Sequence, residues 1–239
     1  TPKVIVEKGN ASAAEARVID LVIEPDTPPK ATELRMYPDK CGNYCGDCKD
    51  PLHPILYWTF SDPDQGDYQT AYQIQIAQNS SFNPILFDTG KKISSSQSYS
   101  VVDSILSFGK EYFWRVRVWD RLIPSDWAVY PKSYIPPAYP YPEPDFSWWP
   151  LTPHLGEETQ FTDMSKAFGG ASLVKWEWTF QHAYPGSATE QNPSATFSVM
   201  PGNKTVTLMI TDSGGLYCDV SKTVVTTSAL PEWDEISPW

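Results

Sequence analysis

The chain has 239 residues, more than one β-sandwich domain of about 100 residues requires and enough for two. A hydrophobic fraction of 41%, with 10 Trp, 13 Tyr and 10 Phe, supplies apolar surface for two cores and excludes a disordered chain. The net charge of −11 excludes nucleic acid as a partner, because phosphate binding requires a cationic surface.

The composition also favours strands over helices. Aromatic and β-branched residues prefer strands, whereas the 23 Pro and 13 Gly interrupt helices and suit turns. The sequence contains no apolar run of about 18 residues, so we expect no membrane insertion by this segment. Because the chain opens at Thr1 without a signal segment, we interpret it as a mature or excised fragment.

The first 26 residues predict a hairpin. Two apolar runs, Val4–Asn10 and Ala16–Ile23, surround a polar turn. The sequence Asp26-Thr-Pro-Pro29 then indicates a linker, because two prolines follow a strand. Residues 1–26 are therefore interpreted as the tail of a preceding domain, and an extra strand on the first sandwich is the alternative.

Residues 27–136 contain strand signals at short intervals, and their hydrophobic period is two. In Tyr72-Gln-Ile-Gln-Ile76 the apolar side chains share one face and the glutamines the other, which is typical of a half-buried antiparallel strand. Arg115 and Arg117 face away from the apolar residues of their strand in the same manner. The predicted strands are Ala31–Met36, Ile55–Phe60, Ala71–Ala77, Ile85–Asp88, Tyr99–Val102 and Tyr112–Trp119.

The Pro/Tyr-rich segment 137–144 predicts a semi-rigid polyproline II linker, since proline lacks the N–H that a central strand donates. Residues 145–228 then predict a second domain, and residues 229–239 a C-terminal tail. Short, regularly spaced strands favour an all-β fold of two tandem immunoglobulin-like antiparallel β-sandwiches. The strands expected in the second domain are Gln160–Thr162, Val174–Phe180, Ala195–Val199, Thr205–Thr211 and Tyr217–Thr226.

Three stretches of the first domain, Tyr57–Asp64, Gln69–Ile76 and Tyr112–Asp120, resemble bacterial and archaeal fibronectin type III-like domains. The second domain resembles a PKD (polycystic-kidney-disease-type) domain, although Gln181–Gly186 replaces the acidic turn usual in that family. The two resemblances imply extracytoplasmic modules of cell-surface proteins or secreted hydrolases. The pieces that resemble the PKD family are Pro144–Ser147, Phe161–Ser165, Lys175–Phe180, Asn192–Phe197, Pro201–Gly202 and Val206–Asp212.

The four cysteines, Cys41, Cys45, Cys48 and Cys218, are candidate disulfide partners. The spacing of the first three also matches the iron–sulfur motif of radical-SAM enzymes, but that cluster lies in an α/β barrel, which this sequence does not predict. A four-thiolate zinc site is another alternative. We favour disulfides, which persist in oxidising compartments, and hence an extracellular or cell-surface location.

The directions of the strands predict where these cysteines meet. The loop with the first three cysteines and the hairpin before Cys218 both fall at the junction of the two domains. Two of the first three would then close a local loop while the third bridges to Cys218. A buried thiol at Cys218, in phase with Val220 and Val224, is the alternative.

No catalytic residue is predicted. The three histidines, His53, His154 and His182, lie scattered in expected loops, and no base, nucleophile and orienting group come together. We interpret His182, near Glu177 and Glu190, as a solvated loop histidine.

Asp62, Asp64 and Asp67 lie in one tight turn and offer oxygen ligands to calcium. Their spacing does not match an EF-hand loop. Asp and Pro also favour turns for local reasons, so the turn interpretation is preferred, and the sequence requires no cofactor.

Aromatic residues around the linker are candidate contacts for sugars or partners: Trp127, Tyr139, Tyr141, Trp148 and Trp149. Packing between the two domains is the alternative role. The sequence thus predicts non-catalytic spacer, adhesion or protein-interaction modules of a larger cell-surface or secreted protein. Their partners would be other domains of that protein and a surface polysaccharide or protein. A carbohydrate-binding accessory region of a secreted hydrolase is the alternative function.

Overall fold

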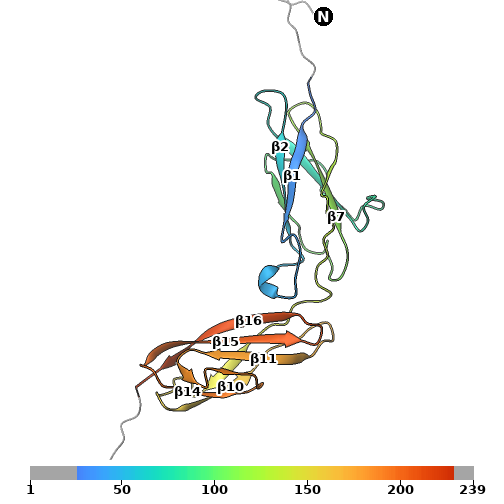
Figure 1. Cartoon of the computed structure of the whole chain (residues 1–239). Helices are drawn as coiled ribbons and strands as arrows, with labels where there is room; N and C mark the ends of the chain where they lie inside the picture. Colours follow the sequence, from blue (N-terminus) through green and yellow to red (C-terminus); the bar gives the residue numbers. More distant parts are fainter. Residues whose placement is uncertain (1–25, 229–239) are drawn as a thin grey trace, which may run out of the picture.

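The computed structural model describes residues 26–228, which form two tandem immunoglobulin-like antiparallel β-sandwiches (Figure 1). The predicted fold class is therefore confirmed. The hairpin expected within residues 1–26 and the tail 229–239 lie outside the described residues, apart from Asp26. The one helical turn in the described range, η1 (Cys45–Asp47), is far too short to cross a bilayer.

The first sandwich packs the sheet β1-β2-β6 against the sheet β4-β3-β7-β8, whose strand β3 also pairs with β5. All six predicted strands are present, with ends shifted by a few residues. The other two, β5 and β8, are too short to show a period in the sequence. The strands are β1 (Lys30–Tyr37), β2 (Ile55–Ser61), β3 (Ala71–Ala77), β4 (Phe87–Asp88), β5 (Lys92–Ile93), β6 (Ser98–Ser100), β7 (Phe113–Trp119) and β8 (Ala128–Val129).

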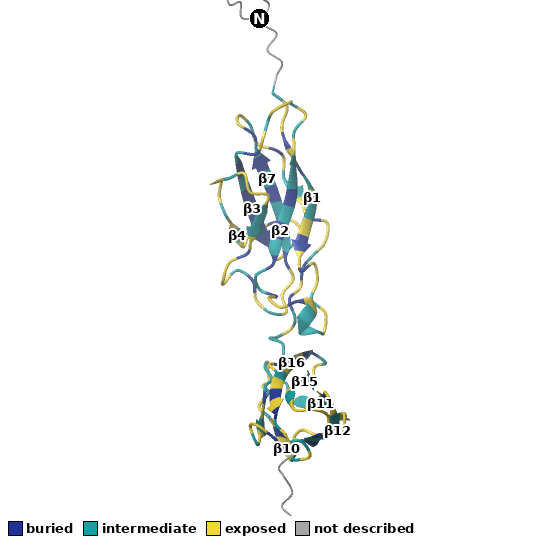
Figure 2. Ribbon diagram, turned by 90° about the vertical axis from the view of Figure 1, so that its left-hand side faces the viewer, coloured by how far each residue is buried: buried dark blue, intermediate teal, exposed yellow. Residues whose placement is uncertain are grey.

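The core of this sandwich lies between its sheets and includes Trp58, Ile74 and Trp114. Alternation along β3 and β7 places these side chains inward, as expected. The prediction that β3 is half-buried is wrong, because Gln73 and Gln75 on its other face are only 7% and 6% exposed. Their polar groups are satisfied by charged side chains that cover this face, and Figure 2 shows β3 as a largely buried strand.

The second sandwich packs the sheet β12-β14-β10-β9 against the sheet β13-β11-β15-β16. The five predicted strands are present, whereas β9, β12 and β13 were not expected. The strands are β9 (Phe146–Trp149), β10 (Glu158–Asp163), β11 (Leu173–Phe180), β12 (Ala183–Tyr184), β13 (Ser187–Ala188), β14 (Ser194–Phe197), β15 (Gly202–Asp212) and β16 (Tyr217–Thr226).

Aromatic rings fill the centre of the second core. The ring of Trp178 lies 5.1 Å from that of Phe146, and Phe161 lies 4.9 Å from Phe180, in tilted and edge-on geometries. Aliphatic residues of β15 such as Leu208, which is the register partner of Trp178 on the neighbouring strand, belong to the same core cluster. The alternation expected in β11 is thus confirmed for Trp178 and Phe180.

Figure 1 shows the second sandwich lying across the end of the first, with β16 as its nearest strand. Strand β16 is an edge strand of its sheet, so its outer backbone groups have no partner within the second sandwich. A loop of the first sandwich that contains η1 reaches this edge. The two ends of the described chain lie far from this junction (Figure 1). Residues of both sandwiches meet at the junction.

Candidate functional site at the junction of the two sandwiches

The loop between β1 and β2 is fixed to the first sandwich by a disulfide between Cys41 and Cys48. Beneath it lies Tyr134, whose hydroxyl donates a hydrogen bond to the carbonyl oxygen of Pro51 at 2.8 Å and lies 3.1 Å from the Cys41 sulfur. Burial raises the pKa of Tyr134 well above its usual range, so this phenol remains a donor. The loop is thereby held in one position relative to the first core.

A second disulfide joins Cys45 of this loop to Cys218 of β16, residues that are 173 positions apart in the sequence. The structure thus contains the predicted arrangement of one local disulfide and one bridge to Cys218. The four cysteines form two disulfides, so none of them is left as a thiolate ligand for the zinc or iron–sulfur alternatives. The side chain of Cys218 is nearly buried, in phase with its strand as the sequence indicated.

Contacts beside this disulfide close the open edge of β16. The backbone N–H of Tyr217 donates to the carbonyl of Asn43 at 2.9 Å, and the rings of Tyr44 and Tyr217 stack with centroids 5.2 Å apart. The hydroxyl of Tyr44 donates to Asp219 at 2.5 Å, and this hydrogen bond raises the pKa of Tyr44 above its ordinary value. The first sandwich therefore supplies a partner for an edge that would otherwise be free to pair with another chain.

Two linker tyrosines hold the connection from both sides. Tyr141 donates a hydrogen bond to the carbonyl of Gly42 at 2.7 Å, while Tyr139 donates to Asp212 at 3.3 Å. Asp212 also accepts the backbone N–H of Gly214 at 2.9 Å, in the hairpin between β15 and β16. A Cβ at Gly214 would overlap the Tyr139 hydroxyl, so the close approach requires glycine there.

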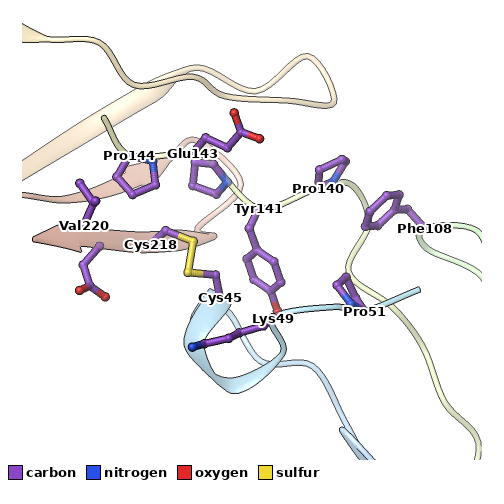
Figure 3. Close-up of a pocket in the computed structure, with 12 residues that line it drawn as sticks. Cys45, Lys49, Pro51, Phe108, Pro140, Tyr141, Glu143, Pro144, Cys218 and Val220 are labelled. Atoms are coloured by element: carbon purple, nitrogen blue, oxygen red, sulfur yellow. A yellow bond between two sulfur atoms is a disulfide. The ribbon is translucent and has the colours of Figure 1, made fainter. Parts of the chain in front are cut away.

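An open pocket of about 450 Å³ lies at this junction (Figure 3). Its wall is largely apolar and includes Phe108, Tyr141 and the prolines of the linker, and the Cys45–Cys218 disulfide lies beside them. Lys49 and Glu143 are among its charged groups. The largely apolar lining among the described residues suits packing or the binding of a ligand.

The five aromatic residues predicted to contact sugars lie in four different environments. Tyr139 and Tyr141 hold the linker, as described above. Trp148 packs against the second core and donates its indole N–H to the carbonyl of Leu151 at 3.1 Å. Trp127 lies beneath two guanidinium groups of the first sandwich. Trp149 alone among the five is well exposed, at 71%.

The polar face of β3 and β7 carries a network that the sequence did not reveal. Arg117 donates to the side-chain oxygen of Gln73 at 2.9 Å, and Arg115 donates to that of Gln75 at 2.8 Å. Both glutamines then donate to Asp88 at 2.6 Å. Burial raises the pKa of Asp88, but the hydrogen bonds from Gln73 and Gln75 outweigh it and hold that pKa below its ordinary value.

Cations and aromatic rings alternate above this network. The Arg115 guanidinium lies 4.5 Å from the centre of the Trp127 ring, and Arg117 lies 4.6 Å from Trp127 and 5.0 Å from Trp119. Lys91 lies 4.8 Å from the Trp119 ring. Each contact is a cation–π interaction in a partly desolvated layer. The signal in the sequence was the pair of arginines two positions apart, which places both on one face of a strand.

Acidic side chains gather at the opposite pole of the first sandwich, where the described chain begins. One oxygen of each of Asp26, Asp64 and Asp67 lies within 4.8 Å of those of the other two. Asp62 accepts the backbone N–H of Asp64 at 2.9 Å, as the turn interpretation expects. The structure thus brings Asp64 and Asp67 together with Asp26, a residue distant in sequence that no motif had indicated.

The electrostatics of this pole are repulsive. Burial raises the pKa of Asp26, and the surrounding carboxylates, Asp120 first among them, raise it further. Arg121 offsets part of this charge through an ion pair with Asp67 at 2.6 Å. The cluster therefore retains an excess of negative charge.

The histidines do not form a catalytic group. The His53 ring lies between Asp50 at 2.6 Å and Asp103 at 2.8 Å. The hydrogen bond to Asp50 is the chief cause of its raised pKa, burial opposes the rise, and Asp103 adds to it. This constellation has a base with two orienting carboxylates and no bonded nucleophile among the described residues.

The other two histidines make different contacts, and Nδ1 of His154 lies 2.8 Å from the hydroxyl oxygen of Thr227. In the part of the chain that the structure describes, no hydrogen bond or ion pair joins the His182 side chain to Glu177 or Glu190, and Glu177 pairs with Lys175 at 2.9 Å. His154 is bonded to the backbone carbonyl of Ser228 at 2.8 Å.

Residues 49–130, which are 82 of the 239 residues, match the family "Rha78A-like, N-terminal immunoglobulin domain". An α-L-rhamnosidase from Streptomyces avermitilis is 35% identical over 74 residues, which are 30% of this chain and 7% of that protein. The chain therefore spans a small part of this relative. The match covers β2 to β8, so the first sandwich is related to a domain of this N-terminal immunoglobulin class.

Solved structures show low overall similarity. The crystal structure of the Streptomyces avermitilis α-L-rhamnosidase complexed with L-rhamnose gives a TM-score of 0.40 at 16% identity, covering 87% of this chain and 26% of that one. The PKD1 domain of Vibrio anguillarum Epp gives a TM-score of 0.32 at 23% identity, covering 39% of this chain and 99% of that one. The two disulfides fit a secreted or extracellular protein.

Proposed function

We propose that this chain is a non-catalytic, rigid two-domain spacer within a larger extracytoplasmic protein. In this proposal residues 27–136 form a fibronectin type III-like domain, residues 145–228 a PKD-like domain, and residues 137–144 the linker. The observation that carries the proposal is the Cys45–Cys218 disulfide, which joins the two sandwiches covalently at a second point. The partners of such a spacer are the domains of the parent protein that it separates.

A second covalent connection changes what the junction does. Domains joined by a single linker move relative to one another unless their interface is large and apolar. Here one small region holds three kinds of contact between the sandwiches: the hydrogen bonds of the linker tyrosines, the Tyr44–Tyr217 stack and the disulfide. Rotation about the linker would break these contacts and is opposed by the disulfide, so the angle between the sandwiches is held.

The experiment is a measurement of rotational diffusion by ¹⁵N NMR relaxation. In the oxidised protein we expect one correlation time for amides of both sandwiches. In the Cys45→Ala/Cys218→Ala variant we expect two shorter correlation times, because each sandwich then reorients about the linker. The Asp39→Asn variant retains both disulfides and serves as the matched control, with a single correlation time. Two correlation times in the oxidised protein would refute the spacer function.

Carbohydrate binding by an accessory module of a hydrolase is the second candidate. Pairing of β12, β14, β10 and β9 places Tyr184, Glu158, Gln160 and Trp149 on one outer sheet face. Tyr184 is 82% exposed and Trp149 71% exposed. Three strand spacings separate them by roughly 14 Å, a span that suits stacking against an extended oligosaccharide.

The test is a glycan array followed by calorimetry with the glycans that bind. Because the relative is an α-L-rhamnosidase, α-L-rhamnosides belong among the probes. Binding that is lost in Trp149→Ala and in Tyr184→Ala, and kept in Leu122→Ala, would establish this function. Leu122 is the matched control, since it is 72% exposed on the first sandwich. Absence of binding to every glycan would leave the spacer as the sole candidate.

A further inference from the structure

The acidic pole of the first sandwich includes buried carboxylate oxygens without hydrogen-bond partners. Asp120 is only 2% exposed, and its Oδ1 accepts the backbone N–H groups of Leu122 at 2.5 Å and Ile123 at 2.7 Å. Its Oδ2 is buried and has no partner among the described residues. The same holds for Oδ2 of Asp62 and Oδ2 of Asp26. Unpaired buried carboxylate oxygens are costly, which indicates that a cation satisfies them.

The charges of this pole point to the same conclusion. The buried Asp120 directly precedes Arg121, whose guanidinium pairs with Asp67 at 2.6 Å, so the Asp120 carboxylate adds negative charge at this pole. Among the described residues, the cation paired with this cluster is Arg121, which contacts Asp67 alone. Local turn formation explains why one oxygen of Asp62 accepts a backbone N–H, and it explains the N–H contacts of Asp120 in the same way. It does not explain the unpaired carboxylate oxygens or the approach of Asp64 and Asp67 to Asp26.

We propose that this pole binds one calcium ion through Asp26, Asp64 and Asp67, whose carboxylate oxygens lie within 4.8 Å of one another, while the unpaired oxygens of Asp62 and Asp120 add negative charge at the same pole. Calcium takes six to eight oxygen ligands in flexible geometry, which suits carboxylates from separate loops. Magnesium requires near-ideal octahedral geometry and dehydrates reluctantly, so we expect it to bind less tightly. The proposal is independent of the spacer and carbohydrate functions.

A bound ion would fix the point where the chain enters the first sandwich. Asp64 already accepts the backbone N–H of Thr27 at 2.7 Å, next to Asp26. The ion would link this entry segment to the β2–β3 turn, which the Arg121–Asp67 ion pair already joins to the end of β7. Calcium would thus order the chain at the end of the first sandwich remote from the disulfide bridge.

The test is isothermal titration of the metal-free, oxidised chain with CaCl₂, together with its Tm as a function of calcium concentration. We expect one site with a Kd of about 10⁻⁴–10⁻³ M, the range of extracellular calcium modules, and a Tm that rises as calcium is added. Asp64→Asn keeps the hydrogen-bond acceptor for Thr27 and removes one charge, so it should weaken binding on the order of tenfold.

The matched control is Asp39→Asn, which removes an exposed carboxylate whose ion pair with Lys132 is 3.8 Å long. This variant should bind calcium like the unaltered chain. Circular dichroism confirms folding, and Asp67→Asn replaces Asp64→Asn if the latter does not fold. The proposal is overturned if the folded chain shows neither heat nor a change of Tm with calcium, if Asp64→Asn binds as tightly as Asp39→Asn, or if magnesium gives the same shift as calcium.

Discussion

At the scale of single residues, His53 couples the stability of the first sandwich to pH. Its ring is hydrogen-bonded to Asp50 and Asp103, and these contacts raise the pKa of His53 in the folded protein above its ordinary value. A group with a raised folded pKa contributes stability that is fully present below its unfolded pKa. This contribution is lost as pH rises through the folded pKa.

Replacing His53 with Gln should therefore destabilise the protein at acidic pH and have little effect at alkaline pH. The loss below about pH 6.5 should be less than about 1 kcal/mol, because the side chain is 34% exposed and the ion pairs are screened by solvent. Urea unfolding of both proteins at a series of pH values measures this loss. A stability difference between them that does not change with pH would contradict the role given to His53. As a control, Asp103→Asn should lower the His53 pKa in an NMR titration.

Trp127 and Trp149 should differ in how much each side chain contributes to stability. Trp127 contacts two guanidinium groups, so Trp127→Ala should destabilise the first sandwich by about 1–2 kcal/mol. Trp149 is 71% exposed, so Trp149→Ala should change stability by no more than about 0.5 kcal/mol. Chemical denaturation measures both. Equal losses of stability in the two variants would show that the cation–π contacts of Trp127 do not stabilise the first sandwich.

At the scale of elements, the loop between β1 and β2 has little secondary structure of its own and depends on its cross-link. Removing the Cys41–Cys48 disulfide in Cys41→Ala/Cys48→Ala should destabilise the first sandwich on the order of 2 kcal/mol, because it frees a loop in the unfolded chain. Hydrogen exchange of residues 38–54 should accelerate. In the Cys45→Ala/Cys218→Ala control these amides should keep their protection, and faster exchange in both variants would refute the local role.

The elements also show what the sequence alone can predict. Strands such as β3 and β16 were placed to the residue, because their apolar residues recur with a period of two over a long run. Strands β5, β8, β12 and β13 contain two residues each, which is too few to show a period. The burial of Gln73 on the second face of β3 depends on Asp88 and Arg117, which lie on other strands and are invisible to a local pattern.

The two candidate sites also differ in how far the sequence predicts them. The junction of the cysteines was predictable because strand direction alternates regularly, which fixes the pole at which each loop lies. The acidic cluster was only half predictable. Asp64 and Asp67 belong to one turn, whereas Asp26 and Asp120 reach it through tertiary folding. Long-range convergence of side chains is the part that periodicity and turn chemistry do not specify.

At the scale of the whole molecule, the chain has two separate cores and two connections between them. One connection is the backbone through residues 137–144, and the other is the disulfide between Cys45 and Cys218. Both reach the same end of the first sandwich, and they leave its acidic pole and the far end of the second sandwich free (Figure 1). These free ends are where adjoining parts of a larger protein would attach.

The disulfide also sets the route by which mechanical tension crosses this chain. When the chain is pulled between residues 26 and 228, the shortest covalent path leaves the backbone at Cys45 and returns at Cys218, which is 173 positions further on, so the residues between the two cysteines carry no tension. At about 3.3–3.6 Å per extended residue, roughly 600 Å of chain cannot be drawn out while the bond is intact. Single-molecule pulling should recover that length only with reductant present, and the bond would make the segment a nearly inextensible tether.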